Sequence, residues 1–367
     1  MNKATSLYLD LVRLSAALTV LVYHFAYERF SGGGLQFIRD LKLGSDAVIV
    51  FFVLSGYVIA WVASERDREL EAYVINRLSR LWSVVIPALI LTVVVDQIGL
   101  HLNPKAYDGW WHQGESPITR TLANLFFLNE LWFYSIRPFS NGPFWSLGYE
   151  FWYYVIFAAA FFFQGRTRLL LVLISVFIAG PKILLLFPVW LFGVWAWHFN
   201  HKQTLPPRLG WFLFLLPVTG YVTIKIFDID GLALEWTNSW LNGQNPRHVL
   251  GFSDEFLISY LYGILIAMHF IGIHAIAPAI EERLISWEKL IRYWAGLTFS
   301  IYLLHYPLLQ FLSAVLPEDW PLIPRNVMVL IMTLAIITVV GNLTEKKKHI
   351  FRYWLRSVIK QGRAQLL

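Results

Sequence analysis

Long apolar runs alternate with short polar segments along nearly all of the 367-residue chain. Runs of about 18–22 apolar residues are long enough to cross a bilayer core of about 30 Å as helices. The pattern therefore predicts an all-α fold, a polytopic bundle of about ten transmembrane helices. The expected spans are residues 6–27, 46–63, 81–100, 143–164, 167–181, 183–199, 209–227, 255–278, 293–315 and 324–343.

One further apolar segment, residues 121–136 ("TLANLFFLNELWFYSI"), is short and contains Asn124, Asn129 and Glu130. We expect it to be interfacial or re-entrant, and the sequence alone leaves open whether it spans. Positive charge favours cytoplasmic loops. With both termini in the cytoplasm, the inner segments hold 19 Lys and Arg residues against 9 outside. If residues 121–136 spanned the membrane, the orientation of every later segment would be reversed and the basic tail would lie outside.

Composition supports the membrane assignment. The chain is 57% hydrophobic and only 15% charged, whereas soluble domains carry about 25% charged residues. It has no cysteine, which excludes disulfides, thiolate metal sites and a cysteine nucleophile. We expect no bound metal and no nucleic-acid partner. The first apolar run holds Asp10 and Arg13 and lacks a small-residue cleavage site, so it is a retained helix rather than a signal peptide.

No linker or soluble domain interrupts the chain, so we divide it into a transmembrane domain, 1–345, and a basic cytoplasmic tail, 346–367. An amphipathic helix with basic residues binds anionic inner-leaflet lipid, and we expect the tail to do so. A merely solvated tail is the alternative. The basic stripe consists of Arg352, Arg356, Lys360 and Arg363, and the apolar area of Phe351, Trp354, Leu355 and Val358.

The first helix carries three polar groups, Asp10, Arg13 and His24, which are costly in hydrocarbon. Arg13 and His24 are separated by eleven positions, which on a helix gives an offset of about 20° and a rise of about 16.5 Å. Asp10 lies one turn below Arg13 on roughly the same face. The three groups therefore form one polar stripe, unless each simply pairs with a neighbouring helix.

Two other features bear on this stripe. Glu150 is expected about two turns into a helix entering from outside, at the depth of His24, where a carboxylate would raise the basicity of the imidazole. The same pair could be a structural ion pair. Arg77 and Arg80, at i and i+3, present two guanidinium forks suited to phosphates. Ordinary positive-inside anchoring is the alternative there.

Five motifs in order resemble those of the membrane-bound type-3 acyltransferases. "DLVRLSAALTVLVYH" resembles the Arg/Lys-x10-His signature, and "FFVLSGYVIA" (51–60) the second-helix motif. "YVINRLSRLWSVVIPALI" resembles the Arg-x-x-Arg segment, "FWSLGYEFWYYVIF" (144–157) the Trp-Ser-Leu-x-x-Glu motif, and "TFSIYLLHYPLL" (298–309) the Ser-x-Tyr-x-x-His-x-Pro motif. The resemblance covers almost the whole chain.

The resemblance implies transfer of an acyl group, usually acetyl, from cytoplasmic acyl-CoA to a sugar hydroxyl. His24 would be catalytic and Glu150 an essential acid, while Arg13, Arg77 and Arg80 would serve the donor. The family often shows Pro after a Glu-Lys/Arg pair, but Glu345 precedes three lysines here, which weakens any role for it. Seven further motif residues would bind substrate or hold the structure: Asp10, Ser55, Trp145, Ser146, Ser300, Tyr302 and His305.

The sequence thus predicts an O-acyltransferase, with acetyl-CoA as the expected donor, in the inner membrane of a bacterium among its lipids. The alternative is a proton-coupled transporter or flippase, because intramembrane Arg, His and Glu also form proton relays. A non-catalytic scaffold would leave the polar stripe unexplained. The acceptor, a carbohydrate or lipid-linked sugar, and the oligomeric state are not specified by the sequence.

Overall fold

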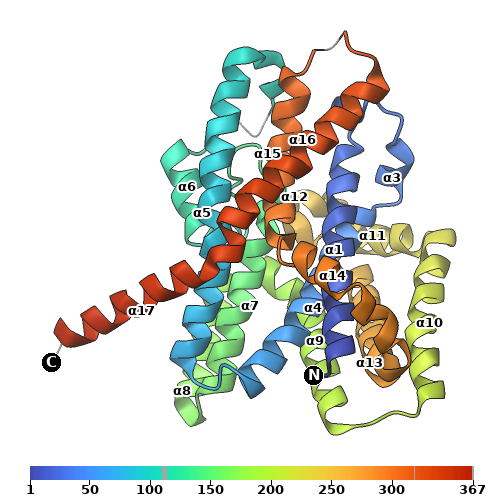
Figure 1. Cartoon of the computed structure of the whole chain (residues 1–367), viewed down its shortest axis with the longest axis vertical. Helices are drawn as coiled ribbons and strands as arrows, with labels where there is room; N and C mark the ends of the chain where they lie inside the picture. The colour runs from blue at the N-terminus through green and yellow to red at the C-terminus, as the bar shows by residue number, and fades with distance from the viewer. Residues whose placement is uncertain (110–113, 318, 366–367) are drawn as a thin grey trace.

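The computed structural model describes residues 1–109, 114–317 and 319–365, and these form helices and connecting turns without a strand (Figure 1). The α-helices are α1 (Lys3–Phe25), α2 (Glu28–Ser31), α3 (Gln36–Asp40), α4 (Leu43–Glu65), α5 (Leu70–Leu102), α6 (Pro117–Leu125), α7 (Trp145–Phe162), α8 (Gly165–Ala179), α9 (Pro181–Lys202), α10 (Pro207–Ile226), α11 (Ile229–Trp240), α12 (Pro246–Leu250), α13 (Phe256–Ser286), α14 (Glu288–Ala295), α15 (Thr298–Val315), α16 (Leu322–Leu343) and α17 (Lys348–Gln365). The 3-10 helices are η1 (Pro104–Tyr107), η3 (Gly142–Phe144), η4 (Gly251–Ser253) and η5 (Glu345–Lys347).

Each of the ten predicted spans contains a helix, and the all-helical prediction is confirmed for the described residues. Eight helical segments there are long and apolar enough to cross a membrane. The other two predicted spans are α7, which carries Glu150 and several tyrosines, and α8, which has only 15 residues. The count of ten and the cytoplasmic position of both termini remain predictions. The N-terminus and the outer end of α17 both lie in the lower half of Figure 1.

Helix α5 begins at Leu70, eleven residues before the predicted start, and runs for 33 residues. Hydropathy alone places the start of this span after Arg77 and Arg80. Charged residues can nevertheless lie within the helix when their side chains have partners in the protein. Arg77 and Arg80 therefore lie inside a long helix instead of at its beginning. This position brings both guanidinium groups into the bundle.

Residues 121–136 do not form a spanning helix. Helix α6 ends at Leu125, and an irregular segment follows as far as η3. Non-helical backbone at membrane depth is tolerated only where protein buries it, and here Asn129, Glu130 and Asn141 are all buried. The carboxylate of Glu130 pairs with the ammonium of Lys182, 2.9 Å away. We call this irregular stretch, residues 126–141, the re-entrant segment. That it enters and leaves the membrane on the same side remains a prediction.

The far end of this re-entrant segment is fixed to two helices. Asp96 of α5 accepts hydrogen bonds from the backbone N–H and hydroxyl of Ser140, at 2.8 and 2.7 Å. The amide of Asn141 donates to the carbonyl of Leu303 in α15, at 2.8 Å. Pro143 and Phe144 are buried. Helix α7 consequently begins within the bundle at Trp145, deeper than a helix entering directly from the outer surface would.

Helices α4 and α9 cross with their backbones almost in contact. A Cβ added to Gly56 would lie 2.0 Å from the carbonyl oxygen of Trp190, and one added to Gly193 would lie 1.9 Å from that of Val53. Small residues allow such close approach between membrane helices, where packing drives association. The Gly56–Gly193 crossing therefore fixes α4 at the centre of the bundle.

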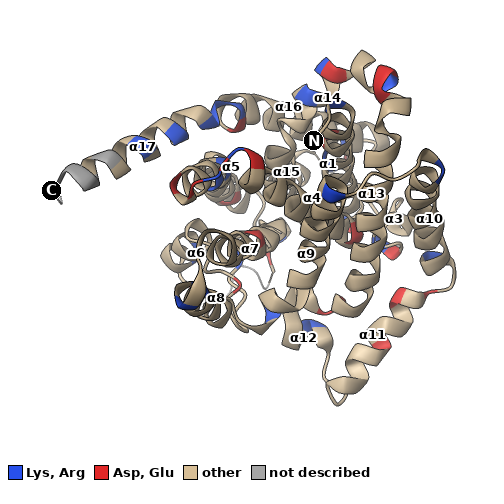
Figure 2. Cartoon of the chain, turned by 90° about the horizontal axis from the view of Figure 1, so that it is seen from below, with Lys and Arg blue, Asp and Glu red and all other residues tan. Residues whose placement is uncertain are grey.

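The tail is helical, as predicted, and α17 extends sideways from the bundle (Figure 1). Lysines and arginines are spaced along it, while charged residues are sparse on most helices of the bundle (Figure 2). Leu355 is buried, and Tyr353, Trp354 and Val358 are exposed. The side chains of Lys360 and Arg363, part of the predicted basic stripe, lie outside the described residues. Contact of the tail with lipid remains a prediction.

Candidate active site

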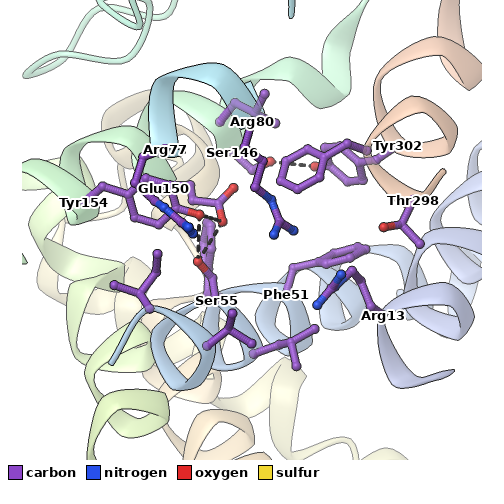
Figure 3. A pocket seen from close by; sticks show the side chains of 16 residues that line it. Arg13, Phe51, Ser55, Arg77, Arg80, Ser146, Glu150, Tyr154, Thr298 and Tyr302 are labelled. Carbon is purple, nitrogen blue, oxygen red and sulfur yellow. Dashed lines mark hydrogen bonds between the residues drawn. The ribbon is translucent and has the colours of Figure 1, made fainter. Parts of the chain in front are cut away.

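A narrow chamber of about 50 Å³ lies between α1, α4, α5, α7 and α15 (Figure 3). Three arginines and one glutamate give its lining a net charge of +2. A volume of this size holds only a few water-sized groups. The charged and polar lining residues are Arg13, Ser55, Arg77, Arg80, Ser146, Glu150, Tyr154, Thr298 and Tyr302.

Two of these arginines have unused hydrogen-bonding capacity. The buried Nε atoms of Arg77 and Arg80 have no hydrogen-bond partner among the described residues. Arg77 reaches Asp67 at 3.4 Å, and the guanidinium of Arg80 lies 4.8 Å from the ring centroid of Phe299. An unsatisfied charged donor in an apolar site is costly, and an anion between these helices would satisfy it. The donor set favours a phosphate-bearing ligand.

Glu150 lies beside Arg77 in the lining of the chamber (Figure 3). Its carboxylate accepts hydrogen bonds from Ser55, at 2.7 Å, and from Tyr154. Ser55 in turn accepts from the indole N–H of Trp190, at 3.2 Å. The second-helix motif and the Trp-Ser-Leu-x-x-Glu motif thus meet at one hydrogen-bond network, which holds α4 and α7 together at the chamber.

The predicted contact between Glu150 and His24 is not formed. Glu150 lies with the arginines in the chamber, and the lining residues in the described part of the chain do not include His24. The depth argument failed because the re-entrant segment carries the start of α7 into the bundle. Each helical turn then lies deeper than counting from the outer surface suggests, so Glu150 reaches the level of Arg13.

A second, more polar cavity adjoins the chamber. This vestibule, of about 140 Å³, shares Arg13 and Arg80 with the chamber. Asp10 accepts from Arg292, at 2.7 Å, and lies 3.4 Å from Arg13, so it orients both guanidinium groups. Four cations face two carboxylates here, again a net charge of +2. The charged lining residues are Asp10, Arg13, Arg80, Arg292, Glu345 and Lys348.

Glu345 has a structural role that the missing proline motif had led us to discount. Its carboxylate accepts hydrogen bonds from the backbone N–H groups of Phe299 and Ser300, at 3.3 and 2.9 Å, and from the Ser300 hydroxyl at 2.8 Å. A carboxylate is favourable at the first turn of a helix because it satisfies free N–H donors. Glu345 therefore caps α15 from η5 and positions the Phe299 ring beneath Arg80.

His24 pairs with His305 of α15. The Nδ1 atom of His24 lies 2.9 Å from Nε2 of His305, whose Nδ1 lies 2.8 Å from the backbone carbonyl of Ile301. A carbonyl only accepts, so His305 donates from Nδ1 and, as a neutral ring, accepts at Nε2. His24 must then donate from Nδ1. This chain of hydrogen bonds leaves the Nε2 lone pair of His24 available as a base.

Aromatic rings and cations surround this histidine pair. Tyr306 lies edge-on to His24, with ring centroids 5.1 Å apart, and Tyr27 stacks against it. The guanidinium of Arg137 lies 5.3 Å from the Tyr306 ring centroid, and that of Arg39 lies 3.7 Å from the Tyr27 centroid. Sequence reasoning missed these residues. Arg137 comes from the re-entrant segment and Arg39 from α3, so no local pattern connects them with His24.

The remaining motif residues connect the chamber to the histidine pair. Ser146 and Tyr302 share a hydrogen bond of 2.7 Å, and the Tyr302 hydroxyl also donates to the carbonyl of Pro143 at 3.0 Å. Tyr302 lines the chamber, and its ring centroid lies 6.3 Å from that of His305. Trp145 instead stacks on Phe252, with centroids 4.3 Å apart, away from the chamber.

Comparison with known proteins identifies the family. A family model described as an acyltransferase domain matches residues 6–341. The chain belongs to the type-3 acyltransferase family. No solved structure matches it. The ordered motifs and the resemblance stated from the sequence are thus confirmed at the level of the family.

Three curated relatives are similar to this type-3 acyltransferase. An O-acetyl transferase of Shigella phage Sf6 is 26% identical over 53% of this chain and 61% of that protein. The peptidoglycan O-acetyltransferase OatA of Listeria monocytogenes is 26% identical over 89% of this chain and 53% of that protein. The acyltransferase MdmB of Streptomyces mycarofaciens is 29% identical over 40% and 36% of the two chains. The matches thus span about a third to three fifths of these relatives.

No three histidine, aspartate or glutamate side chains within the described part of this acyltransferase are grouped so that they could hold a metal ion. The described site combines a hydrogen-bonded pair of imidazoles with a cationic, narrow chamber. The charged and polar residues of the chamber, vestibule and histidine pair come from α1, α4, α5, α7, α14, α15, η5 and α17, which are spread over the whole sequence.

Proposed function

We propose that the protein is a membrane O-acyltransferase that moves an acyl group, preferentially acetyl, from acyl-CoA to a hydroxyl of a carbohydrate acceptor. The observation that supports it most directly is that the cationic vestibule and the narrow chamber share Arg13 and Arg80, and that the chamber is lined by Tyr302, one helical turn from His305. Family membership and the activities named for the relatives are consistent with this activity.

The two cavities match the two parts of an acyl-CoA donor. The vestibule, at the predicted cytoplasmic end, has the volume and the positive charge for phosphates, with Arg80, Arg292 and Lys348 around it. The chamber is narrow and mostly apolar, which suits the thin arm that ends in the thioester. Arg13 and Arg80 border both cavities, so they would hold the donor where its head meets its arm.

His24 acts as general base in this proposal. Its Nε2 atom takes the proton from the acceptor hydroxyl as the hydroxyl oxygen attacks the thioester carbonyl carbon. The carbon–sulfur bond then breaks, and the thiolate of coenzyme A leaves and takes up the proton from the imidazolium. His305 holds the tautomer that this step requires. Such a base contributes about 10²–10⁴-fold to the rate.

The test is acyl transfer by the purified full chain in lipid nanodiscs, with radiolabelled acetyl-CoA and a mixture of bacterial glycans. We expect label on a glycan, and loss of transfer in His24→Ala with the helical content unchanged. Near-normal transfer by this variant would exclude His24 as the base. Movement of a substrate across the membrane without label would instead support the proton-coupled transporter, which family membership does not favour.

A further inference from the structure

A third and larger cavity lies on a different face of α4 from the chamber. It has a volume of about 480 Å³, within the range of about 300–1,000 Å³ that is typical of small-molecule sites. Its walls come from α1, α4, α10 and α13 and are mostly apolar. Val218 of α10, which lines the cavity, is 52% exposed. Apolar side chains exposed at membrane depth face lipid, so this lateral cavity opens toward the bilayer.

One end of the lateral cavity is polar. Asp46 of α4 accepts a hydrogen bond from Tyr221, at 2.7 Å, and pairs with Lys225, at 2.9 Å. Lys225 also pairs with Asp230, at 2.8 Å. Asp46 and Tyr262 line both this cavity and a small adjoining pocket of about 40 Å³, which contains Asp254, Glu255 and Trp145.

The tyrosine at this junction has an unsatisfied hydroxyl. Tyr262 is 3% exposed, and its buried hydroxyl has no hydrogen-bond partner among the described residues. Such a group is costly to bury without a partner. Its position on the lining of both pockets places the unused donor and acceptor where a ligand group could reach them.

The charges at the polar end of the lateral cavity indicate which kind of ligand head group could bind there. The cations at this end are already paired with carboxylates: Lys225 with Asp46 and Asp230, Lys42 with Glu255 at 2.6 Å, and Arg247 with Asp254 at 3.0 Å. No surplus of positive charge is available for a phosphate, in contrast to the chamber and vestibule. Carboxylates accept hydrogen bonds from hydroxyl groups. The site therefore suits an uncharged, hydroxyl-bearing head.

We propose that the lateral cavity is the acceptor site, and that the acceptor is a membrane amphiphile whose hydrocarbon chain lies between α1 and α10 while its neutral, hydroxylated head contacts Asp46 and Tyr262. The assignment rests on the proposed acyl transfer. The chamber of about 50 Å³ cannot hold a sugar together with the donor, so the acceptor needs a separate approach.

The register of α1 and α4 places the polar end near the histidine pair. A Cβ on Gly44 would lie 2.1 Å from the ring of Tyr23, so the start of α4 packs against the residue next to His24. Asp46 is two positions further along α4 and is therefore close to the His24 end of α1. The apolar part of the cavity extends the other way, toward Tyr8 and His269.

Photolabelling tests the site without requiring acyl transfer. The full chain in phosphatidylcholine nanodiscs is irradiated with a decyl glucoside that carries a diazirine at the chain end. We expect labelled peptides from α1, α10 and α13, with competition by unlabelled decyl glucoside and none by free glucose. Val218→Trp, at the cavity mouth, should reduce labelling about ten-fold or more, the scale of losing two buried methylenes. Val222→Trp, one turn away and 49% exposed, is the matched control and should not.

Tyr262→Phe separates a ligand contact from a structural one. Removal of an unsatisfied hydroxyl should leave the melting temperature unchanged or raised. Labelling should nevertheless fall about five-fold, the effect of one net hydrogen bond. Equal labelling of wild type, Val218→Trp and Tyr262→Phe would overturn the assignment.

Acyl transfer then distinguishes this inference from the proposed function. With acetyl-CoA present, we expect transfer to decyl glucoside with a KM raised in Val218→Trp, and unchanged binding of coenzyme A. Transfer that is equal for wild type and Val218→Trp would overturn the acceptor site and leave the proposed function intact. Labelling of the cavity without transfer to any acceptor would overturn both the proposed function and the acceptor role.

Discussion

At the scale of single residues, the histidine pair shows how a neighbouring helix can determine the chemistry of a side chain. His305 is completely buried and donates to the carbonyl of Ile301 in its own helix. That bond uses the N–H of His305, so the Nε2 atom of His305 can only accept a hydrogen bond, from Nδ1 of His24. His24 therefore presents its Nε2 atom to the site. His305 is therefore a positioning residue for His24.

We predict that His305→Ala lowers kcat for acyl transfer about 10–100-fold, the scale at which partners that orient a histidine act. The KM for acetyl-CoA should change little, because His305 does not border the donor cavities. His305→Gln should recover part of kcat, since its side-chain oxygen can accept from Nδ1 of His24. Steady-state kinetics with both substrates varied measures the two constants. Equal kcat for the Ala and Gln variants would contradict the positioning role.

The unsatisfied arginines yield a second prediction at this scale. Arg80→Ala should weaken coenzyme A binding about 10–100-fold, the range for a hydrogen bond to a charged group. Arg80→Lys should recover only part of the affinity, because an ammonium lacks the guanidinium fork. Isothermal titration with coenzyme A measures both. Arg166→Ala, an exposed residue of α8, is the control. Unchanged affinity in Arg80→Ala would return this residue to membrane anchoring.

At the scale of elements, the re-entrant segment determines the depth of α7. It is anchored by Asp96, by Asn141 and by the buried pair of Glu130 and Lys182. Lys182 also donates to the carbonyl of Tyr134 and the hydroxyl of Ser135, at 2.6 and 3.0 Å. Glu130 and Lys182 thus provide hydrogen-bond partners for backbone and side-chain groups of a segment that lacks helical hydrogen bonds.

Breaking this pair should destabilise the fold. Loss of one partner of a buried ion pair costs about 3–5 kcal/mol, so Glu130→Gln and Lys182→Met should each lower the melting temperature markedly. The double variant should lower the melting temperature by less than the sum of the two single changes. Tryptophan fluorescence during heating measures the transitions, with Lys105→Met, an exposed residue, as control. Additive losses would show that the two side chains act independently.

The elements also show which parts of the site were predictable. Each of the ten apolar runs contains a helix, because burial in lipid leaves a strong local pattern. Glu150 was misplaced because its depth depends on the re-entrant segment, whose path is determined by contacts with Asp96, Leu303 and Lys182. The cap by Glu345 and the pairing of His24 with His305 join residues more than 40 positions apart. Neither leaves a spacing that a single sequence reveals.

At the scale of the whole molecule, the two groups of cavities lie on different faces of α4. The chamber and vestibule carry net positive charge and meet at Arg13, whereas the lateral cavity is apolar and ends at Asp46. In the proposed orientation the donor enters from the cytoplasm and the acceptor from the bilayer. The orientation itself is therefore central to the function.

The absence of cysteine from the chain makes the orientation directly measurable. Gln203→Cys, between α9 and α10, should react with a membrane-impermeant maleimide only from the cytoplasmic side. Gln244→Cys, between α11 and α12, should react only from the outside. Labelling of spheroplasts and of inverted vesicles measures the two. Both positions are exposed. Reaction of both residues from one side would contradict the proposed arrangement of spans.

The close crossing at Gly56 and Gly193 has a consequence for motion. Helices whose backbones touch cannot slide or rotate past each other without a clash, so α4 and α9 move as one rigid pair. The chamber, which is narrow in this state, can widen through displacement of α5, α7 or α15 while α4 stays in place. Exchange of the donor can therefore leave α1, α4, α10 and α13, which enclose the lateral cavity, where they are.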